Sequence, residues 1–192
     1  KHMGYQVRKN LGSILHDNGV DFCVRAPFAK KVALLLSVEF DFEEHEMTSD
    51  GAGYWSIEDV KAEAGQSYKY RITTPAGEKL DRNDPYARQL TDSDKGNSVI
   101  VQRNFEWEGA EHFKAAPKEK TVIYELHVGT FNKPDASTAG TFASASEKLD
   151  YLANLGITHI ELMPVTSMAT SHGWGYAPNY IFSVENSYGG RH

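Results

Sequence analysis

The chain has 192 residues, a formal net charge of −6 at neutral pH and hydrophobic residues at 40% of its positions, which is ordinary for a globular protein of one or two domains. The acidic balance argues against a nucleic-acid partner, because phosphate binding requires clustered Lys and Arg side chains. No apolar run is long enough to cross a membrane, so we expect no membrane partner. The single cysteine, Cys23, excludes an intrachain disulfide and is expected to be buried. This composition permits a cytoplasmic location, which we predict.

The first hundred residues have the pattern of an all-β domain. Short runs rich in β-branched and aromatic residues alternate with Gly, Pro, Asn and Asp, which is typical of a β-sandwich. Tyr68 and Tyr70 alternate with polar residues, so one face of their strand is expected to be buried. A glucan-binding surface made by these two tyrosines with Tyr54 and Trp55 is the alternative. The predicted strands are 20–26, 31–37, 54–60, 67–73 and 98–101.

Two further features of this region have competing interpretations. The acidic run 39–46 is expected to be a solvated strand edge or loop. Asp81, Asn83 and Asp84 offer the oxygen ligands that calcium prefers, but the run lacks the Gly and the closing Glu of an EF-hand loop. Turn formation before Pro85 explains these residues equally well.

A charged stretch, 105–120, is predicted to link two domains. Trp107 lies within it, and burial of its large indole against one of the domains is the expected role. A platform for sugar rings is the alternative for this side chain.

The region after residue 120 changes from strand periodicity to helical periodicity, which indicates a βα unit. Thr141 is expected to cap a helix whose inward stripe is Phe142, Ala145, Leu149 and Leu152, and Gly156 to end it. Residues 157–165 are apolar enough for a strand covered on both faces. Residues 166–172 are then expected to open a loop at the carboxyl end of that strand, the end at which ligands bind in barrels and open α/β sheets.

Charged residues on the two predicted strands suggest a second kind of site. Glu125 and His127 fall on one face of the first strand, and His159 and Glu161 on one face of the second. A metal site or an acid/base pair is conceivable there, but no third ligand with suitable spacing is evident, and paired polar residues are common inside barrels. We therefore predict no metal and no cofactor.

Two sets of short segments carry resemblances to known families. In the second region they are 124–131 (YELHVGTF), 140–142 (GTF), 155–165 (LGITHIELMPV), 173–176 (GWGY) and 188–190 (YGG), and upstream they are 22–29 (FCVRAPFA), 53–55 (GYW), 68–71 (YKYR) and 84–87 (DPYA). With these segments, the second region resembles the start of the catalytic barrel in the alpha-amylase superfamily, glycoside hydrolase family 13. The first region resembles carbohydrate-binding module family 48, the sandwich that precedes this barrel in branching enzymes, debranching enzymes and malto-oligosyltrehalose trehalohydrolases.

The resemblance implies an immunoglobulin-like sandwich over 1–104, a linker over 105–120 and the first βαβ portion of a (β/α)₈ barrel over 121–192. Such a barrel requires eight units, so we expect the amino-terminal part of a longer enzyme. The implied activity is hydrolysis or branching of α-1,4- or α-1,6-linked glucans such as glycogen or starch, with a non-catalytic glucan-binding or scaffold protein as the alternative. Neither resemblance predicts the oligomeric state.

The same resemblance implies where the chemistry lies. In the family, the catalytic carboxylates follow the segment at 188–190, so no residue of this chain is predicted to be catalytic and the chain alone is expected to show no turnover. Tyr176 is predicted to stack against a glucose ring at the scissile bond. Trp174 is predicted either to line the same pocket or to hold the loop onto the barrel. The glycines beside it, Gly173 and Gly175, are expected to allow the sharp turn that holds both aromatic rings outward.

Overall fold

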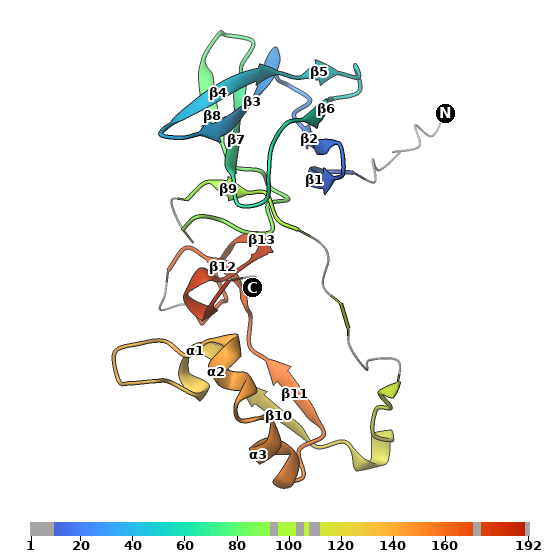
Figure 1. The fold of residues 1–192 in the computed structure, drawn as a ribbon, viewed down its shortest axis with the longest axis vertical. Helices are drawn as coiled ribbons and strands as arrows, with labels where there is room; N and C mark the ends of the chain where they lie inside the picture. Colours follow the sequence, from blue (N-terminus) through green and yellow to red (C-terminus); the bar gives the residue numbers. More distant parts are fainter. Residues whose placement is uncertain (1–9, 93–95, 103–105, 108–111, 171–173, 191–192) are drawn as a thin grey trace. The chain divides into compact units, whose positions relative to one another are not determined.

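A computed structural model describes residues 10–92, 96–102, 106–107, 112–170 and 174–190. It divides the chain into two compact units, Lys1–Thr91 with Gly96–Gln102 and Asp92–Lys95 with Arg103–His192. The first unit is drawn from blue to green in Figure 1 and contains the sheets of a sandwich. Among the described residues, no helix is both long and apolar enough to cross a membrane.

The first unit consists of two antiparallel sheets. One sheet has the strand order β1-β2-β6-β5, and the other has the order β4-β3-β7-β8, with β9 also paired to β7. The strands are β1 (Gly12–His16), β2 (Gly19–Arg25), β3 (Lys31–Val38), β4 (Asp41–Glu46), β5 (Thr48–Ser49), β6 (Tyr54–Val60), β7 (Ser67–Thr73), β8 (Lys79–Arg82) and β9 (Ser98–Val99).

The inner faces of the two sheets share one hydrophobic core. Alternating side chains of β2 and β6 meet those of β3 and β7, as expected for a sandwich. Tyr68 and Tyr70 are 0% and 1% exposed, so these two rings belong to the core and the alternative of a glucan-binding surface made by them is wrong. Cys23 is buried, as predicted.

The sequence predicted the central strands better than the edges. β6 and β7 have the predicted bounds, whereas β1, β5 and β8 were not predicted and β4 was expected only as a solvated strand edge or loop. β4 carries most of the acidic run and lies at the edge of its sheet with five of its six residues exposed, which confirms a solvated strand edge. Its periodicity is hidden because charged residues occupy both faces of the strand.

The run Asp81–Asp84 is explained by two separate sets of protein contacts. The Arg71 guanidinium donates to both carboxylate oxygens of Asp81, at 2.8 and 2.9 Å. Asp84 is fully buried and accepts hydrogen bonds from the hydroxyls of Tyr68 at 2.8 Å and Tyr70 at 3.2 Å. Burial raises the pKa of the Asp84 carboxyl, although hydrogen bonds from the Tyr86 amide and the two hydroxyls oppose the shift. Asp84 thereby fixes the segment between β8 and β9 to the core.

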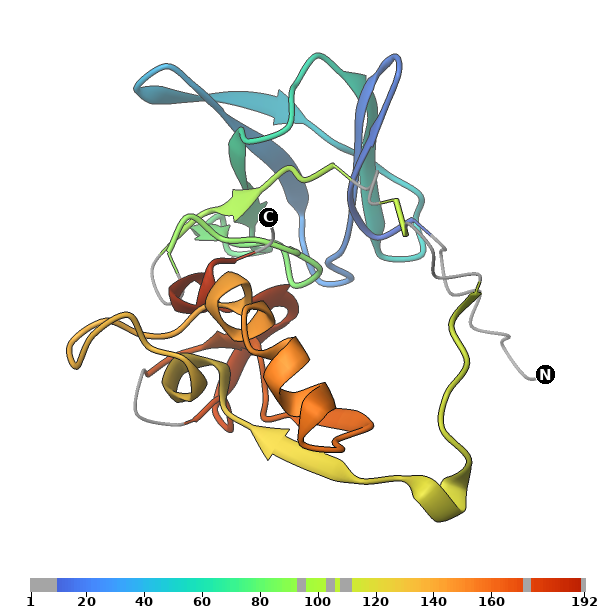
Figure 2. The ribbon, with the colours of Figure 1, turned by 60° about the horizontal axis from the view of Figure 1, so that its bottom comes forward.

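The second unit begins with a parallel βαβ arrangement. The short helix η2 (Lys118–Lys120) precedes β10 (Ile123–Leu126), which pairs in parallel with β11 (His159–Leu162). The connection contains α1 (Val128–Phe131), α2 (Phe142–Ser146) and α3 (Leu149–Asn154), of which α2 and α3 are the orange helices in Figure 2. Leu152 and Leu126 belong to one small core, so the helical connection packs against the carboxyl end of β10. The other residues of β10 and β11 are exposed or half-buried, so the expected covering of the second strand on both faces is not seen in the described part of the chain.

The helical connection differs from the single predicted helix. The Thr141 side chain accepts a hydrogen bond from the Ser144 amide in a capping box, and Gly156 has a φ of +93°, which confirms both predicted ends. Between them, Lys148 has φ −101° and ψ 4° and interrupts the helix. The interruption turns Leu149 outward, so its side chain is 48% exposed while Leu152 is 2% exposed. The prediction of one continuous inward stripe is therefore wrong at Leu149.

Two other predictions for this unit require correction. The predicted loop over 166–172 begins with a strand, because β12 (Thr166–Met168) pairs with β13 (Pro178–Val184), and η3 (Asn186–Tyr188) follows. Residues 171 and 172 of that loop lie outside the described residues. Trp107 is 76% exposed, so it does not anchor the predicted linker by burial. Residues 105 and 108–111 of that linker lie outside the described residues.

Candidate functional site

The two predicted site residues lie in the connection between β12 and β13. These strands pair antiparallel, with Met168 opposite Pro178, and the Ala169 amide donates to the Ala177 carbonyl oxygen at 3.3 Å. Trp174 and Tyr176 therefore sit near the end of a hairpin that follows β11. Gly173, which was predicted to be part of the same motif, lies outside the described residues.

Gly175, the residue between the two aromatic residues, holds the backbone against Pro164, which follows β11. Gly175 has a φ of +84°, and a Cβ atom added to it would lie 2.4 Å from the carbonyl oxygen of Pro164 and 2.7 Å from the Pro164 Cβ. Only glycine fits such an approach, both because of the left-handed backbone and because of the missing space. The contact seats the hairpin connection on Pro164.

The aromatic rings on either side of Gly175 are exposed. Trp174 is 62% exposed and Tyr176 is 66% exposed. Trp174 has a φ of +48°, which costs a residue with a side chain about 1–2 kcal/mol. Among the described residues the indole gains little packing in return, and both predicted roles of Trp174, lining the pocket and holding the loop onto the barrel, stay open. The assignment of both rings to substrate binding stays a prediction.

A histidine–tyrosine pair, which the sequence analysis missed, lies at the carboxyl end of β10. The Tyr188 hydroxyl and His127 Nε2 are 2.7 Å apart, and His127 Nδ1 is 3.0 Å from the Thr130 hydroxyl. The Tyr188 ring lies over Gly129, where an added Cβ would approach its Cε1 atom to 2.7 Å. Burial raises the pKa of the Tyr188 hydroxyl, and the Glu185 carboxylate adds to the shift. The only sequence signal was the glycine at 129, which permits the close approach.

The carboxylate of Glu185 is used for structure. Glu185 is 4% exposed and accepts hydrogen bonds from the amides of Met168 at 3.2 Å and Ser187 at 3.1 Å. It therefore ties the β12 strand to η3, the element that contains Tyr188. Together these contacts fix the carboxyl-terminal end of β10 to the segment that follows β13.

The suggested cluster of Glu125, His127, His159 and Glu161 does not form a common ligand set. Glu125 pairs in register with Glu161, but His127 contacts Tyr188 and His159 Nδ1 lies 2.9 Å from the Thr158 hydroxyl. Within the described ranges, the one group of three metal-ligating side chains within mutual reach is in the first unit, not here. The contacts of these four residues are therefore explained by a structural role and not by a shared metal site.

Comparison with known families assigns both units. The family described as "Carbohydrate-binding module 48 (Isoamylase N-terminal domain)" matches residues 2–87, and the family "Alpha amylase, catalytic domain" matches residues 123–192. The first match covers the strands of the sandwich up to β8, and the second starts at β10. The architecture is a sandwich followed by the first βαβ portion of a (β/α)₈ barrel.

Individual relatives agree with this assignment. A malto-oligosyltrehalose trehalohydrolase of Saccharolobus solfataricus is 36% identical over 94% of this chain, and a 1,4-alpha-glucan branching enzyme of Bacillus cytotoxicus is 33% identical over 91% of it. The chain spans 30% and 28% of the lengths of these curated relatives.

Solved structures show the same fold. A GBS pullulanase in complex with maltotetraose superposes with a TM-score of 0.77 at 27% identity, over 96% of this chain and 29% of that one. The catalytic module of a glycogen-degrading pneumococcal virulence factor superposes with a TM-score of 0.76 at 27% identity, over 96% of this chain and 33% of that one.

Proposed function

We propose, on the premise that this chain belongs to the alpha-amylase superfamily, glycoside hydrolase family 13, that it is the amino-terminal part of an enzyme that hydrolyses or branches α-1,4- or α-1,6-linked glucans. The observation that carries the proposal is the succession, within one chain, of a carbohydrate-binding module and the opening of an alpha-amylase catalytic domain. The names of the relatives, a trehalohydrolase, a branching enzyme and a pullulanase, support an α-glucan as the substrate class.

Tyr176 is the proposed substrate contact, with Trp174 beside it. The flat apolar face of an aromatic ring packs against the C–H groups of a pyranose, and its quadrupole favours the positive charge that develops at the anomeric carbon. The exposure of both rings supports this role, since neither side chain has to leave a core to meet a sugar.

The catalytic carboxylates are proposed to lie outside these 192 residues. Glycoside hydrolysis needs one carboxyl group as acid and a second as nucleophile or base, on opposite sides of the scissile bond. In the second unit, Glu185 is occupied by two backbone amides, and Glu125 and Glu161 lie side by side on neighbouring strands. We therefore assign the chain a binding role in the reaction.

The sandwich is proposed to support the catalytic domain, with α-glucan as a partner of the chain as a whole. Since Tyr68 and Tyr70 are in the core, any glucan contact by this unit would have to use other side chains. A cytoplasmic location belongs to the same proposal and is supported by the single buried cysteine, which excludes an intrachain disulfide.

The test has a binding arm and a turnover arm. The 192-residue chain should bind maltoheptaose and not a β-1,4-linked oligosaccharide of the same length, and it should release no product from amylose. Failure to bind maltoheptaose would contradict the substrate class, and product release by the chain alone would contradict the assignment of the carboxylates.

The alternative of a non-catalytic scaffold needs a separate assay. The natural protein that contains this chain is purified and assayed on amylose, amylopectin and maltooligosyl-trehalose. Turnover of one of these glucans supports the enzyme, and inactivity on all three supports the scaffold.

A further inference from the structure

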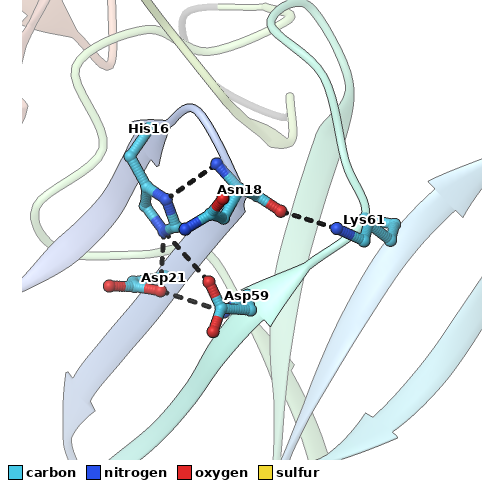
Figure 3. A network of polar contacts seen from close by, with 5 residues as sticks. All are labelled: His16, Asn18, Asp21, Asp59 and Lys61. Atoms are coloured by element: carbon cyan, nitrogen blue, oxygen red, sulfur yellow. Dashed lines mark hydrogen bonds and ion pairs between the residues drawn. The ribbon is translucent and has the colours of Figure 1, made fainter.

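Three metal-ligating side chains converge on the outer face of the sandwich, in the sheet β1-β2-β6-β5. His16 ends β1, Asp21 lies on β2, and Asp59 lies on β6, the other neighbour of β2 (Figure 3). The neighbours Val20 and Val60 point into the core, so Asp21 and Asp59 point away from it. The group is far along the chain from the Trp174–Tyr176 loop and was not indicated by the sequence.

A β-bulge brings the two carboxylates together. In the pairing of β2 with β6, Val20 is opposite Val60 and Phe22 is opposite Ile57. Two residues of β6, Glu58 and Asp59, therefore face the single residue Asp21, which is the arrangement of a bulge. Asp59 has a φ of +53°, and its amide donates to Asp21 Oδ1 at 3.0 Å. Bulges of this kind redirect a side chain, and here Asp59 is redirected toward His16.

The separations fit one small ion. His16 Nε2 is 3.0 Å from Asp21 Oδ1 and 3.8 Å from Asp59 Oδ1, and the three ligand atoms lie within 4.8 Å of one another. In a tetrahedral zinc site with bonds of about 2.0–2.2 Å, neighbouring ligand atoms are about 3.4 Å apart. The two distances from His16 bracket that value, each differing from it by about 0.4 Å. The two carboxylate oxygens lie within 4.8 Å of each other, so rotation of the aspartate side chains has to close the remaining gap and place all three atoms around one ion.

The charge and accessibility of the group also suit a cation. Two carboxylates face one imidazole, and the side chains of His16, Asp21 and Asp59 are 31%, 37% and 66% exposed. An ion can enter from solvent, and water can complete its coordination. Lys61, next to the group in Figure 3, donates its ammonium to the Asn18 carbonyl oxygen at 2.7 Å.

The donor set selects the class of metal. One imidazole nitrogen with two carboxylate oxygens suits zinc and related divalent transition metals, whereas calcium and magnesium favour six or more oxygen ligands. We propose that His16, Asp21 and Asp59 form a binding site for a divalent transition-metal ion of the zinc class, with water as the remaining ligand. Such an ion would link the β1–β2 hairpin to β6.

The metal-free hydrogen bonds provide a local signal for binding. The Asn18 amide donates to His16 Nδ1 at 3.3 Å, so Nδ1 carries no proton and the ring proton is on Nε2, toward Asp21. When a metal replaces that proton at Nε2, the neutral ring carries its proton on Nδ1, and the Asn18 amide loses its acceptor. Metal binding therefore breaks the long, exposed hydrogen bond from the Asn18 amide to His16 Nδ1, which is worth about 0.5–1.5 kcal/mol. It should move the amide resonance of Asn18 together with the ring resonances of His16.

The experiment is a titration of the 192-residue chain with Zn²⁺, followed by nuclear magnetic resonance and by the melting temperature, with Mg²⁺ as the control ion. Zn²⁺ should saturate the shifts of Asn18 and His16 at one equivalent and raise the melting temperature, since a ligand that binds only the folded state stabilises it. Mg²⁺ should do neither at equal concentration.

Variants separate this site from adventitious binding. His16→Gln and Asp59→Asn should each weaken Zn²⁺ binding on the order of 10-fold or more. Asn tolerates the left-handed backbone of residue 59, so the metal-free Asp59→Asn variant should keep the melting temperature of the parent chain. His45→Gln is the matched control, because His45 Nε2 is 3.6 Å from Glu43 Oε2 in another histidine–carboxylate pair, and it should leave Zn²⁺ binding unchanged. Unshifted Asn18 and His16 resonances, or undiminished Zn²⁺ affinity in both site variants, would overturn the proposal.

Discussion

Replacing Gly175 by Ala tests whether the Trp174–Tyr176 loop is seated on Pro164. The new Cβ would lie 2.4 Å from the Pro164 carbonyl oxygen, so the backbone must move by 1.0 Å to reach an ordinary contact of 3.4 Å. The left-handed backbone adds about 1–2 kcal/mol for a residue with a side chain, and relief of the overlap costs about 1–3 kcal/mol. We expect Gly175→Ala to lower the free energy of unfolding of the second unit by about 2–5 kcal/mol in total.

Gly156→Ala supplies the control for the backbone term. Gly156 has a φ of +93°, but a Cβ added there meets no atom within 4 Å, so this variant should cost only the about 1–2 kcal/mol of the left-handed conformation. The assay is native-state hydrogen exchange at the Met163 amide, which donates to the Leu126 carbonyl oxygen at 2.9 Å between β11 and β10 and reports opening of the second unit. Equal losses in the two variants would refute the reasoning that the loop is held by the contact with Pro164.

Three further predictions concern the contacts that fix each unit. Because burial raises the pKa of Asp84, the stability that its protonated form contributes is present below its unfolded pKa of about 3.9 and is lost as the pH rises through the folded value. In urea unfolding between pH 4 and pH 7, the parent chain should therefore lose stability relative to Asp84→Asn. A difference in stability that stays constant over this pH range would contradict the prediction. Thr141→Ala should destabilise the second unit by about 1 kcal/mol through loss of the capping box, measured by the same hydrogen exchange; Thr141→Ser should retain most of that stability, and equal losses would contradict the cap. Tyr188→Phe should cost about 0.5–1.5 kcal/mol, because His127 Nε2 loses its 2.7 Å partner while the ring over Gly129 is kept; an unshifted His127 ring resonance in this variant would contradict the pairing.

The elements that were predicted correctly from the sequence are those with a regular alternation of apolar and polar residues or with a local capping partner. β7 was predicted with its bounds because Tyr68 and Tyr70 face the core while their neighbours do not, and the capping of Thr141 was predicted because its partner Ser144 is local. β4 was predicted only as a solvated strand edge or loop, without bounds, because its alternation is masked by charge on both faces. The break at Lys148 was missed because it depends on how the two short helices pack, which a periodicity over ten residues does not resolve.

The candidate sites divide in the same way. Tyr176 and Trp174 were selected because the segment 173–176 resembles a substrate-binding loop of the alpha-amylase superfamily, and the seat on Pro164 explains why Gly175 is needed there. The domain bounds at 104 and 120, and the roles of both aromatics, stay predictions. The group at His16, Asp21 and Asp59 had no sequence signal, because strand pairing and a bulge bring together residues that are up to 43 positions apart.

The most direct test of the account maps maltoheptaose onto the loop. In a titration of the 192-residue chain followed by nuclear magnetic resonance, the indole N–H of Trp174 and the ring of Tyr176 should shift, and the core rings of Tyr68 and Tyr70 should not. Tyr176→Ala should weaken binding by about 2- to 12-fold, the equivalent of about 0.5–1.5 kcal/mol of ring packing, whereas Tyr176→Phe should retain it. Binding of maltoheptaose that leaves both loop aromatics unshifted and is unaffected by Tyr176→Ala would contradict the central claim.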